Sequence, residues 1–146
     1  MLRSMAPTLN DREQEFPRVD DRVISRPHQY GYSAMIGEVT RAITPTGDFA
    51  DDAFTNALLR HDLSAGTVQV RQFARDAAVG EAVFAPRSAD AAEDDGYVMA
   101  FAHNPDRGAS DLIILAAQDF TGQPVARVHL PARIPLGFHG SWIPDH

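Results

Sequence analysis

The sequence contains neither cysteine nor lysine. Without cysteine, disulfides, thiol nucleophiles, iron–sulfur clusters and cysteine-type zinc sites are all excluded. All 13 residues counted as lysine or arginine are arginine, so Schiff-base chemistry and the lysine of a phosphate-binding loop are excluded too. Any metal that this chain binds must be held by nitrogen or oxygen ligands.

Long apolar runs and basic clusters are also missing. No stretch approaches the roughly 18 to 20 consecutive apolar residues of a membrane span, and the first residues lack the apolar segment of a secretory signal. The net charge is −7 and no basic stripe occurs, so a nucleic-acid backbone would be repelled. We therefore expect a cytoplasmic chain with no membrane span and no nucleic-acid partner.

Short apolar runs with a period of two dominate the chain from Thr67 onward. Each run is bounded by Gly, Pro, Asp or Asn, which is typical of strands joined by turns. A length of 146 residues suits one domain, so we predict a single, mainly β domain. The predicted strands are residues 66–73, 81–86, 96–103, 111–117 and 124–131.

The last three of these strands are joined by short connections rich in turn-forming residues, 104–110 and 118–123. Residues 96–131 are therefore predicted to form an antiparallel three-stranded meander. Both faces of the strand at 96–103 are apolar, so we expect both to be buried by sheets on either side. Meanders that pack face to face suggest a propeller or a sandwich.

The segment around residues 50–58 fits two structures. Its apolar residues recur at helical spacing behind an acidic pair, which favours a helix. Residues 56–73 also fit a strand, a turn and a second strand, and periodicity alone leaves both open. Residues 1–12 are predicted to be disordered or irregular, and residues 87–95 to form a mobile surface segment.

Six histidines are present, and none has the local spacing of a metal-binding motif. Five fit ordinary positions: surface or turn residues at His28, His61 and His103, a strand residue at His129, and a mobile terminus at His146. His139 differs, because two glycines flank it and two aromatic residues stand beside it. The glycines would allow close backbone approach and the aromatics, Phe138 and Trp142, would exclude water. The pattern fits a dry metal or catalytic site, but by itself it favours a packed structural histidine.

Two glutamates, Glu15 and Glu81, each stand at the head of an apolar strand with a proline nearby. A buried carboxylate must be paired or hydrogen-bonded, so an inward-pointing glutamate would need a partner such as an imidazole N–H. The residue pattern by itself favours strand-edge glutamates in water.

Three stretches, "EFPRVD" (15–20), "GEAVFAP" (80–86) and "PLGFHGSW" (135–142), occur in this order, with "HDLSAGTV" and "AQDFTGQPVARVHLP" between them. Together they resemble the C-terminal portion of the carotenoid cleavage oxygenases, a family that includes lignostilbene-cleaving dioxygenases and the retinal pigment epithelium isomerase. The resemblance spans residues 13–145. It implies the last two or three blades of a seven-bladed β-propeller over residues 13–146, and a strand for "NALLRHDL".

The resemblance also implies a metal site. Members of this family hold a ferrous ion with four histidines, and glutamates form hydrogen bonds to some of these histidines. His139 matches the last iron-binding histidine, while Glu15 and Glu81 match two supporting glutamates. The family pattern implies that Glu81 orients His139 and that the histidine partner of Glu15 lies in sequence absent here. Neutral imidazoles suit iron(II), and a carboxylate on the far ring nitrogen fixes the tautomer.

The implied activity is oxidative cleavage, by dioxygen, of a conjugated carbon–carbon double bond in an apolar carotenoid, apocarotenoid or stilbene. Complete members are several times longer and supply three further ligand histidines, and no other histidine here matches a ligand position. We therefore expect a fragment that is inactive alone and needs a missing N-terminal part or a complementary chain. Two alternatives stay open: a non-catalytic β module without metal, and a small β protein that binds an apolar ligand.

Overall fold

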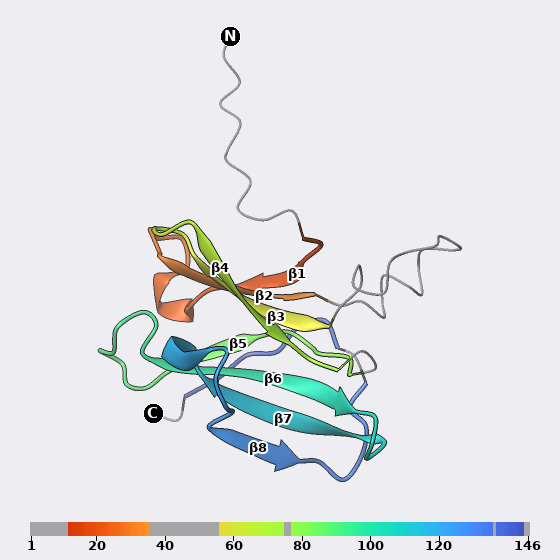
Figure 1. Ribbon diagram of the computed structural model, residues 1–146. Coiled ribbons are helices and arrows are strands. Elements are labelled where there is room, and N and C mark those ends of the chain that lie inside the picture. The colour runs from red at the N-terminus through yellow and green to blue at the C-terminus, as the bar shows by residue number, and fades with distance from the viewer. Residues whose placement is uncertain (1–11, 36–55, 75–76, 136, 145–146) are drawn as a thin grey trace.

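Two four-stranded antiparallel sheets make up the part of the chain that the structure describes (Figure 1). The computed structural model describes residues 12–35, 56–74, 77–135 and 137–144. The irregular segment expected at 1–12 lies outside these ranges except for its last residue, and residues 50–55 of the helical alternative lie outside them as well.

The first sheet has the strand order β1-β2-β3-β4. Its strands are β1 (Glu15–Arg18), β2 (Tyr30–Met35), β3 (Ala57–Asp62) and β4 (Thr67–Gln72), and a short 3-10 helix, η1 (Asp21–Val23), follows β1. β3 pairs in regular antiparallel register with both β2 and β4. The strand interpretation of "NALLRHDL" is therefore confirmed, as is the turn that follows it.

The second sheet has the strand order β5-β6-β7-β8. Its strands are β5 (Val83–Pro86), β6 (Gly96–Asn104), β7 (Ala109–Ala116) and β8 (Ala126–His129), with a 3-10 helix, η2 (Ala117–Asp119), after β7. The meander predicted over residues 96–131 is confirmed, and β5 adds a fourth strand. The β6–β7 turn ends at Gly108, whose φ of 61° is a conformation that glycine adopts without steric cost.

One apolar core joins the two sheets. Alternate residues of β6 face the first sheet, because successive strand side chains point to opposite faces; these are Val98, Ala100 and Ala102, all buried. From the first sheet, Tyr32 stacks on Phe84 with ring centroids 5.7 Å apart and lies 6.3 Å from Phe120. The two sheets therefore pack face to face around shared aromatic rings.

The outer face of the second sheet contradicts one expectation from the sequence. Both faces of residues 96–103 were expected to be buried, but Phe101 is 46% exposed, and Met99 and Leu112 are half-buried. The physical reason is that no third sheet among the described residues covers this face. Among the described residues, 133–135 and 137–142 cross it.

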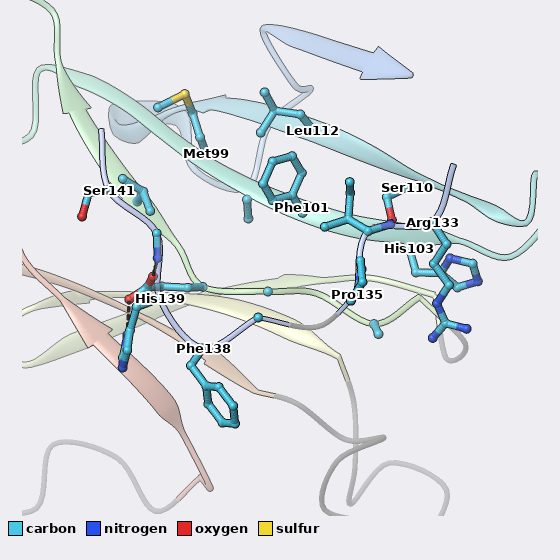
Figure 2. Close-up of a pocket in the computed structure, with 18 of the residues that line it drawn as sticks. Met99, Phe101, His103, Ser110, Leu112, Arg133, Pro135, Phe138, His139 and Ser141 are labelled. Carbon is cyan, nitrogen blue, oxygen red and sulfur yellow. Dashed lines mark hydrogen bonds and ion pairs between the residues drawn. The ribbon is translucent and has the colours of Figure 1, made fainter. Parts of the chain in front are cut away.

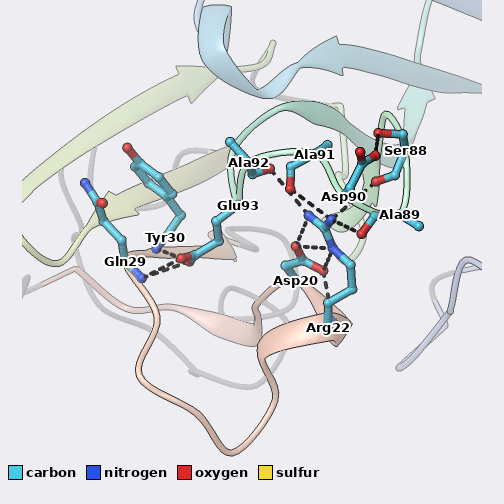
Figure 3. Close-up of polar contacts among 10 residues, drawn as sticks. All are labelled: Asp20, Arg22, Gln29, Tyr30, Ser88, Ala89, Asp90, Ala91, Ala92 and Glu93. Carbon is cyan, nitrogen blue, oxygen red and sulfur yellow. Dashed lines mark hydrogen bonds and ion pairs between the residues drawn. The ribbon is translucent and has the colours of Figure 1, made fainter.

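Arg22 joins the first sheet to the β5–β6 connection of the second sheet (Figure 3). Its guanidinium donates to the Asp20 carboxylate at 2.6 to 3.1 Å. It also donates to backbone carbonyls of the β5–β6 connection, including those of Ala89 and Ala91 at 2.9 and 3.0 Å. Residues 87–90 of this predicted surface segment are exposed, and an arginine from the neighbouring sheet binds the backbone of the connection.

The same connection is held by its own acidic residues. Glu93 accepts hydrogen bonds from the backbone N–H groups of Gln29 and Tyr30, at 2.7 to 3.1 Å (Figure 3). Asp94 accepts one from Arg60 on β3 at 2.9 Å. Residues that suggest a solvated loop in the sequence thus serve as contacts between the sheets.

His61 is also placed differently from its prediction. It was interpreted as a surface or turn residue, but it lies buried on β3, and its Nε2 is 3.1 Å from the Ser33 hydroxyl. Burial lowers the pKa of His61, as expected when a charged imidazolium would lose hydration. Among the described residues, no helix is long and apolar enough to span a membrane.

Candidate metal centre

The C-terminal segment, defined as residues 131–135 and 137–144, crosses the outer face of the second sheet and brings His139 to Glu81 (Figure 2). Nδ1 of His139 lies 3.2 Å from Oε1 of Glu81. The other carboxylate oxygen, Oε2, accepts the backbone N–H of Gly140 at 2.6 Å. His139 and Gly140, which are 58 and 59 positions after Glu81 in the sequence, therefore both bind its carboxylate.

Burial makes this carboxylate demanding. The Glu81 side chain is only 6% exposed, and a carboxylate removed from water must be paired or hydrogen-bonded. It has three donors, because the Arg18 guanidinium also donates to Oε1 at 3.2 Å. The interpretation of Glu81 as a strand-edge glutamate in water, which the residue pattern favoured, is wrong.

The hydrogen bond to Glu81 fixes which nitrogen of His139 carries the proton. A carboxylate is only an acceptor, so Nδ1–H is the donor, and the lone pair of the neutral ring is on Nε2. Among the described residues, no group bonds Nε2, and the ring is 73% exposed. The arrangement presents one imidazole nitrogen as a free electron-pair donor.

Phe16 on β1 supports the ring from one side. Its ring centroid lies 5.7 Å from that of His139 at an interplanar angle of 85°, and 6.5 Å from that of Phe138. Edge-to-face contacts of this kind favour a fixed ring orientation. His139 is thus oriented by its hydrogen bond to Glu81 and by its edge-to-face contact with Phe16.

The expected exclusion of water from His139 is not found. Phe138 and Trp142 are exposed, as is His139 itself, because no other described element lies over the C-terminal segment. The expected role of the glycines is also only partly met. A side chain at Gly137 would meet no other atom closely, whereas Gly140 lies beside Glu81 and supplies an N–H that Glu81 binds.

Glu15 does not join this group. It is exposed at the first position of β1, where its backbone pairs with Ala34. Among the described residues, none donates a hydrogen bond to its carboxylate. Its neighbour Arg18 does reach Glu81, and the sequence interpretation assigned it no role. The signal available for Arg18 was its place in the "EFPRVD" stretch, three residues after Glu15 on the same short strand.

A cavity of about 440 Å³ lies between the outer face of the second sheet and the C-terminal segment (Figure 2). Apolar side chains line most of it, from both the sheet and the segment: Val83, Met99, Phe101, Leu112, Ile134 and Phe138. His139 and Glu81 lie on its wall. The open nitrogen donor therefore stands beside an apolar space of the size that small-molecule sites occupy.

The described residues do not form a complete metal site. No group of three or more histidine and acidic side chains among them could hold a metal ion. His28 is exposed in a turn, and His129 on β8 pairs with Asp111 at 2.8 Å. The chemistry of His139 fits one ligand of iron(II), for which neutral imidazole is a suitable donor, and the remaining ligands must come from elsewhere.

Comparisons with known proteins show which family the chain is similar to. The sequence matches the retinal pigment epithelial membrane protein family over residues 3–144. It is 36% identical over 142 residues to a carotenoid cleavage oxygenase of Mycobacterium tuberculosis, covering 95% of this chain and 26% of that protein. It is also 36% identical over 128 residues to an apocarotenoid-15,15'-oxygenase of Synechocystis, covering 88% of this chain and 24% of that protein.

Solved structures agree with the sequence comparison. The crystal structure of a cobalt-substituted Synechocystis apocarotenoid oxygenase superposes with a TM-score of 0.77 at 35% identity, over 94% of this chain and 26% of that one. Its fold confirms that the two sheets are blades of a β-propeller. The chain therefore belongs to the carotenoid cleavage oxygenase family and spans about a quarter of the length of the relatives that it matches.

Proposed function

We propose that this chain supplies one corner of an iron(II) centre in an oxygenase that cleaves a conjugated carbon–carbon double bond of a carotenoid, apocarotenoid or stilbene. The observation that carries the proposal is the Glu81–His139 hydrogen bond, which leaves Nε2 of His139 open beside an apolar cavity. Relatives named apocarotenoid-15,15'-oxygenase and lignostilbene-alpha,beta-dioxygenase support the substrate class. A cobalt-substituted form of a structural neighbour supports a metal in that enzyme.

In this proposal His139 is a ligand and Glu81 holds its ring. The carboxylate keeps the proton on Nδ1, so the lone pair of Nε2 is available to bind a metal ion without the loss of a further proton. Glu15 would support a histidine that lies outside the described chain. Iron(II), when bound, would supply the site at which dioxygen is activated beside the alkene.

The cavity would contribute a wall to the substrate site. A conjugated apolar molecule gains free energy by leaving water, in proportion to the apolar area that it buries. Phe101, Met99 and Leu112 present such a surface next to His139. The chain thus combines, in one place, a metal donor and an apolar surface for an alkene.

One imidazole cannot hold iron well, so the isolated 146-residue chain is expected to have no dioxygenase activity. The measurement is the iron content of the purified chain and its turnover of an apocarotenoid under air. Stoichiometric iron together with cleavage by the isolated chain would contradict this expectation.

A graft tests the proposed function itself. In the graft, this chain replaces the aligned quarter of the Synechocystis apocarotenoid oxygenase, so that the rest of the propeller supplies the missing ligands. We expect about one iron per protein and cleavage of an apocarotenoid. Removal of a metal-orienting carboxylate commonly costs 10- to 100-fold in affinity or activity, so Glu81→Gln in the graft should lose about that much, and His139→Ala at least as much.

His28→Ala is the matched control, because His28 is an exposed histidine in a turn far from the proposed centre in sequence. It should leave iron content and cleavage unchanged. A graft that keeps full iron and activity after His139→Ala would remove the basis of the proposal.

A second candidate function follows from the cavity alone: a metal-free module that binds an apolar ligand. In this case the isolated chain would bind an apocarotenoid with the same affinity before and after His139→Ala, and the graft would lack iron. Fluorescence quenching of Trp142, which lines the cavity, measures that affinity.

A further inference from the structure

Arg18 lies where β1, Glu81 and the C-terminal segment meet. One nitrogen of its guanidinium, Nη1, is 3.2 Å from Oε1 of Glu81 and 2.9 Å from the carbonyl oxygen of Gly140. Its other terminal nitrogen, Nη2, is 3.6 Å from Asp21. Arg18 therefore contacts both the carboxylate that holds His139 and the backbone next to His139.

Arg18 supplies the positive charge next to the Glu81 carboxylate, which the neutral ring of His139 does not supply. A neutral imidazole gives Glu81 a hydrogen bond but no compensating charge, and an uncompensated buried carboxylate is costly. Among the described residues, Arg18 is the cation in contact with Glu81. Its guanidinium gives a second, charged donor to the same carboxylate oxygen that accepts the Nδ1–H of His139.

Arg18 and Glu81 also bind both backbone polar groups of Gly140. Glu81 accepts the N–H of Gly140 at 2.6 Å, while Arg18 donates to its C=O at 2.9 Å. The Arg18–Glu81 contact closes this set of hydrogen bonds into a ring. The residue directly after His139 thus has both of its backbone polar groups bound.

The backbone of β1 is distorted at this point. Glu15 and Arg18 are three positions apart on β1, whereas their partners on β2, Ala34 and Tyr32, are two positions apart, so the ladder contains a β-bulge. Inside it, Phe16 has a φ of 55°, an uncommon conformation for a residue with a side chain and one that costs free energy. The two side chains of β1 that touch the His139 site, those of Phe16 and Arg18, flank or occupy this bulge.

From these contacts we propose that Arg18 is a positioning residue for the iron site, acting through Glu81 and Gly140 to fix the tautomer and place of His139. This inference rests on the proposed function of the same site. Loss of Arg18 frees the Glu81 carboxylate and the Gly140 backbone to move apart. His139 then loses the Glu81 contact that selects Nδ1–H.

Nitrogen-15 NMR of the histidine rings in the 146-residue chain tests this without any metal. At a pH of about 8, above the usual imidazole pKa of about 6.5, two-bond nitrogen–proton couplings identify the tautomer of a neutral ring. Signals that vanish in His139→Gln belong to His139. The unsubstituted chain should show the Nδ1–H form. Because hydrogen bonds to charged groups are among the stronger ones, Arg18→Met should lower the ratio of Nδ1–H to Nε2–H on the order of tenfold.

Two further variants separate positioning from packing. Arg18→Lys keeps the charge and should hold the ratio within about twofold of the unsubstituted chain. Arg22→Met removes the other arginine that joins β1–η1 to the second sheet and should leave His139 unchanged. If Arg18→Met does not fold, Arg18→Gln replaces it, with the same expected loss. An unchanged ratio in the folded neutral variant, or an equal change in Arg22→Met, would overturn the inference.

The same spectra distinguish failure of the inference from failure of the proposed function. An Nε2–H form in the unsubstituted chain would contradict the Glu81–His139 geometry on which the iron proposal depends. An Nδ1–H form that survives Arg18→Met would leave that proposal intact and remove only the role of Arg18.

Discussion

Arg18 and Arg22 are four residues apart, and both reach from the first sheet to the second, but their partners differ in kind. Arg22 binds a neighbouring carboxylate and carbonyl oxygens of the 87–95 connection. Arg18 binds Glu81 and the backbone beside an exposed histidine. Arg22 therefore contacts only groups that stabilise the fold, whereas Arg18 contacts a group whose free nitrogen can do chemistry. The same residue type serves stability in one place and orientation in the other.

The largest expected effect is on the structural side of this comparison. Arg22→Met leaves Asp20, which is 2% exposed, without its arginine. Breaking a buried pair in this way costs about 3 kcal/mol, so the free energy of unfolding should fall by about that amount. Urea unfolding monitored by circular dichroism measures it. A loss no larger than that of an exposed substitution would show that the contacts of Arg22 do not stabilise the junction of the sheets.

A second arginine–carboxylate group extends the comparison to the edge of the second sheet. Asp111 on β7, 1% exposed, pairs with Arg107, Arg127 and His129. Burial tends to raise the pKa of Asp111, but hydrogen bonds from His129, Asn104 and Arg127 outweigh it and lower the pKa to about 2.

This group predicts acid sensitivity with a defined sign. Because the folded-state pKa is below the unfolded value of 3.8, the stabilisation is fully present above pH 4 or so, and it is lost as the pH falls through about 2. The loss should be on the order of 1 to 2 kcal/mol. Unfolding measured between pH 5 and 2 should show it, and Asp111→Asn should flatten that part of the profile; an equally steep profile in the variant would contradict the assignment.

A smaller effect on stability is expected at the chemical side. Arg18→Met removes a hydrogen bond to the exposed carbonyl of Gly140 and one of the three donors of Glu81, which keeps those of His139 and Gly140. About 1 kcal/mol of unfolding free energy should therefore be lost. The ratio of the two losses sharpens the comparison: Arg22→Met should destabilise more and leave His139 unchanged, while Arg18→Met should destabilise less and alter His139. The reverse order in urea would mean that Arg18 serves mainly to hold the sheets together.

The smallest effect on folding belongs to His139 itself. Its ring is 73% exposed, and substitutions at such positions usually change stability by less than about 0.5 kcal/mol. His139→Ala should therefore unfold at nearly the same urea concentration as the unsubstituted chain. A loss of several times that size would mark His139 as a packed structural residue, the other interpretation that the sequence pattern allowed.

The sequence predicted the regular parts of the fold better than the contacts between them. Period-two runs and turn-forming residues located β4 and the β6–β8 meander, because alternation and turns are local properties. β2 was missed, since "YGYSAM" alternates poorly and contains glycine. The contacts of the 87–95 connection were missed because Arg22 binds backbone carbonyls there, and a carbonyl has no side-chain signal.

The candidate site could be predicted only by resemblance. Glu15 and Glu81 have the same local pattern, yet one is exposed and the other buried against His139. The difference arises from which strand end the C-terminal segment passes, a long-range property that no local pattern contains. The exposure of His139 was not foreseen for the same reason, since it depends on the elements that lie beside it.

The proposal that His139 is an iron ligand is tested most directly by the position of iron in crystals of the graft, located by anomalous scattering at the iron absorption edge. We expect an iron peak bonded to Nε2 of His139, with Nδ1 of the same ring hydrogen-bonded to Glu81. Iron bonded to other residues only, or a ring turned so that Glu81 contacts Nε2, would contradict it.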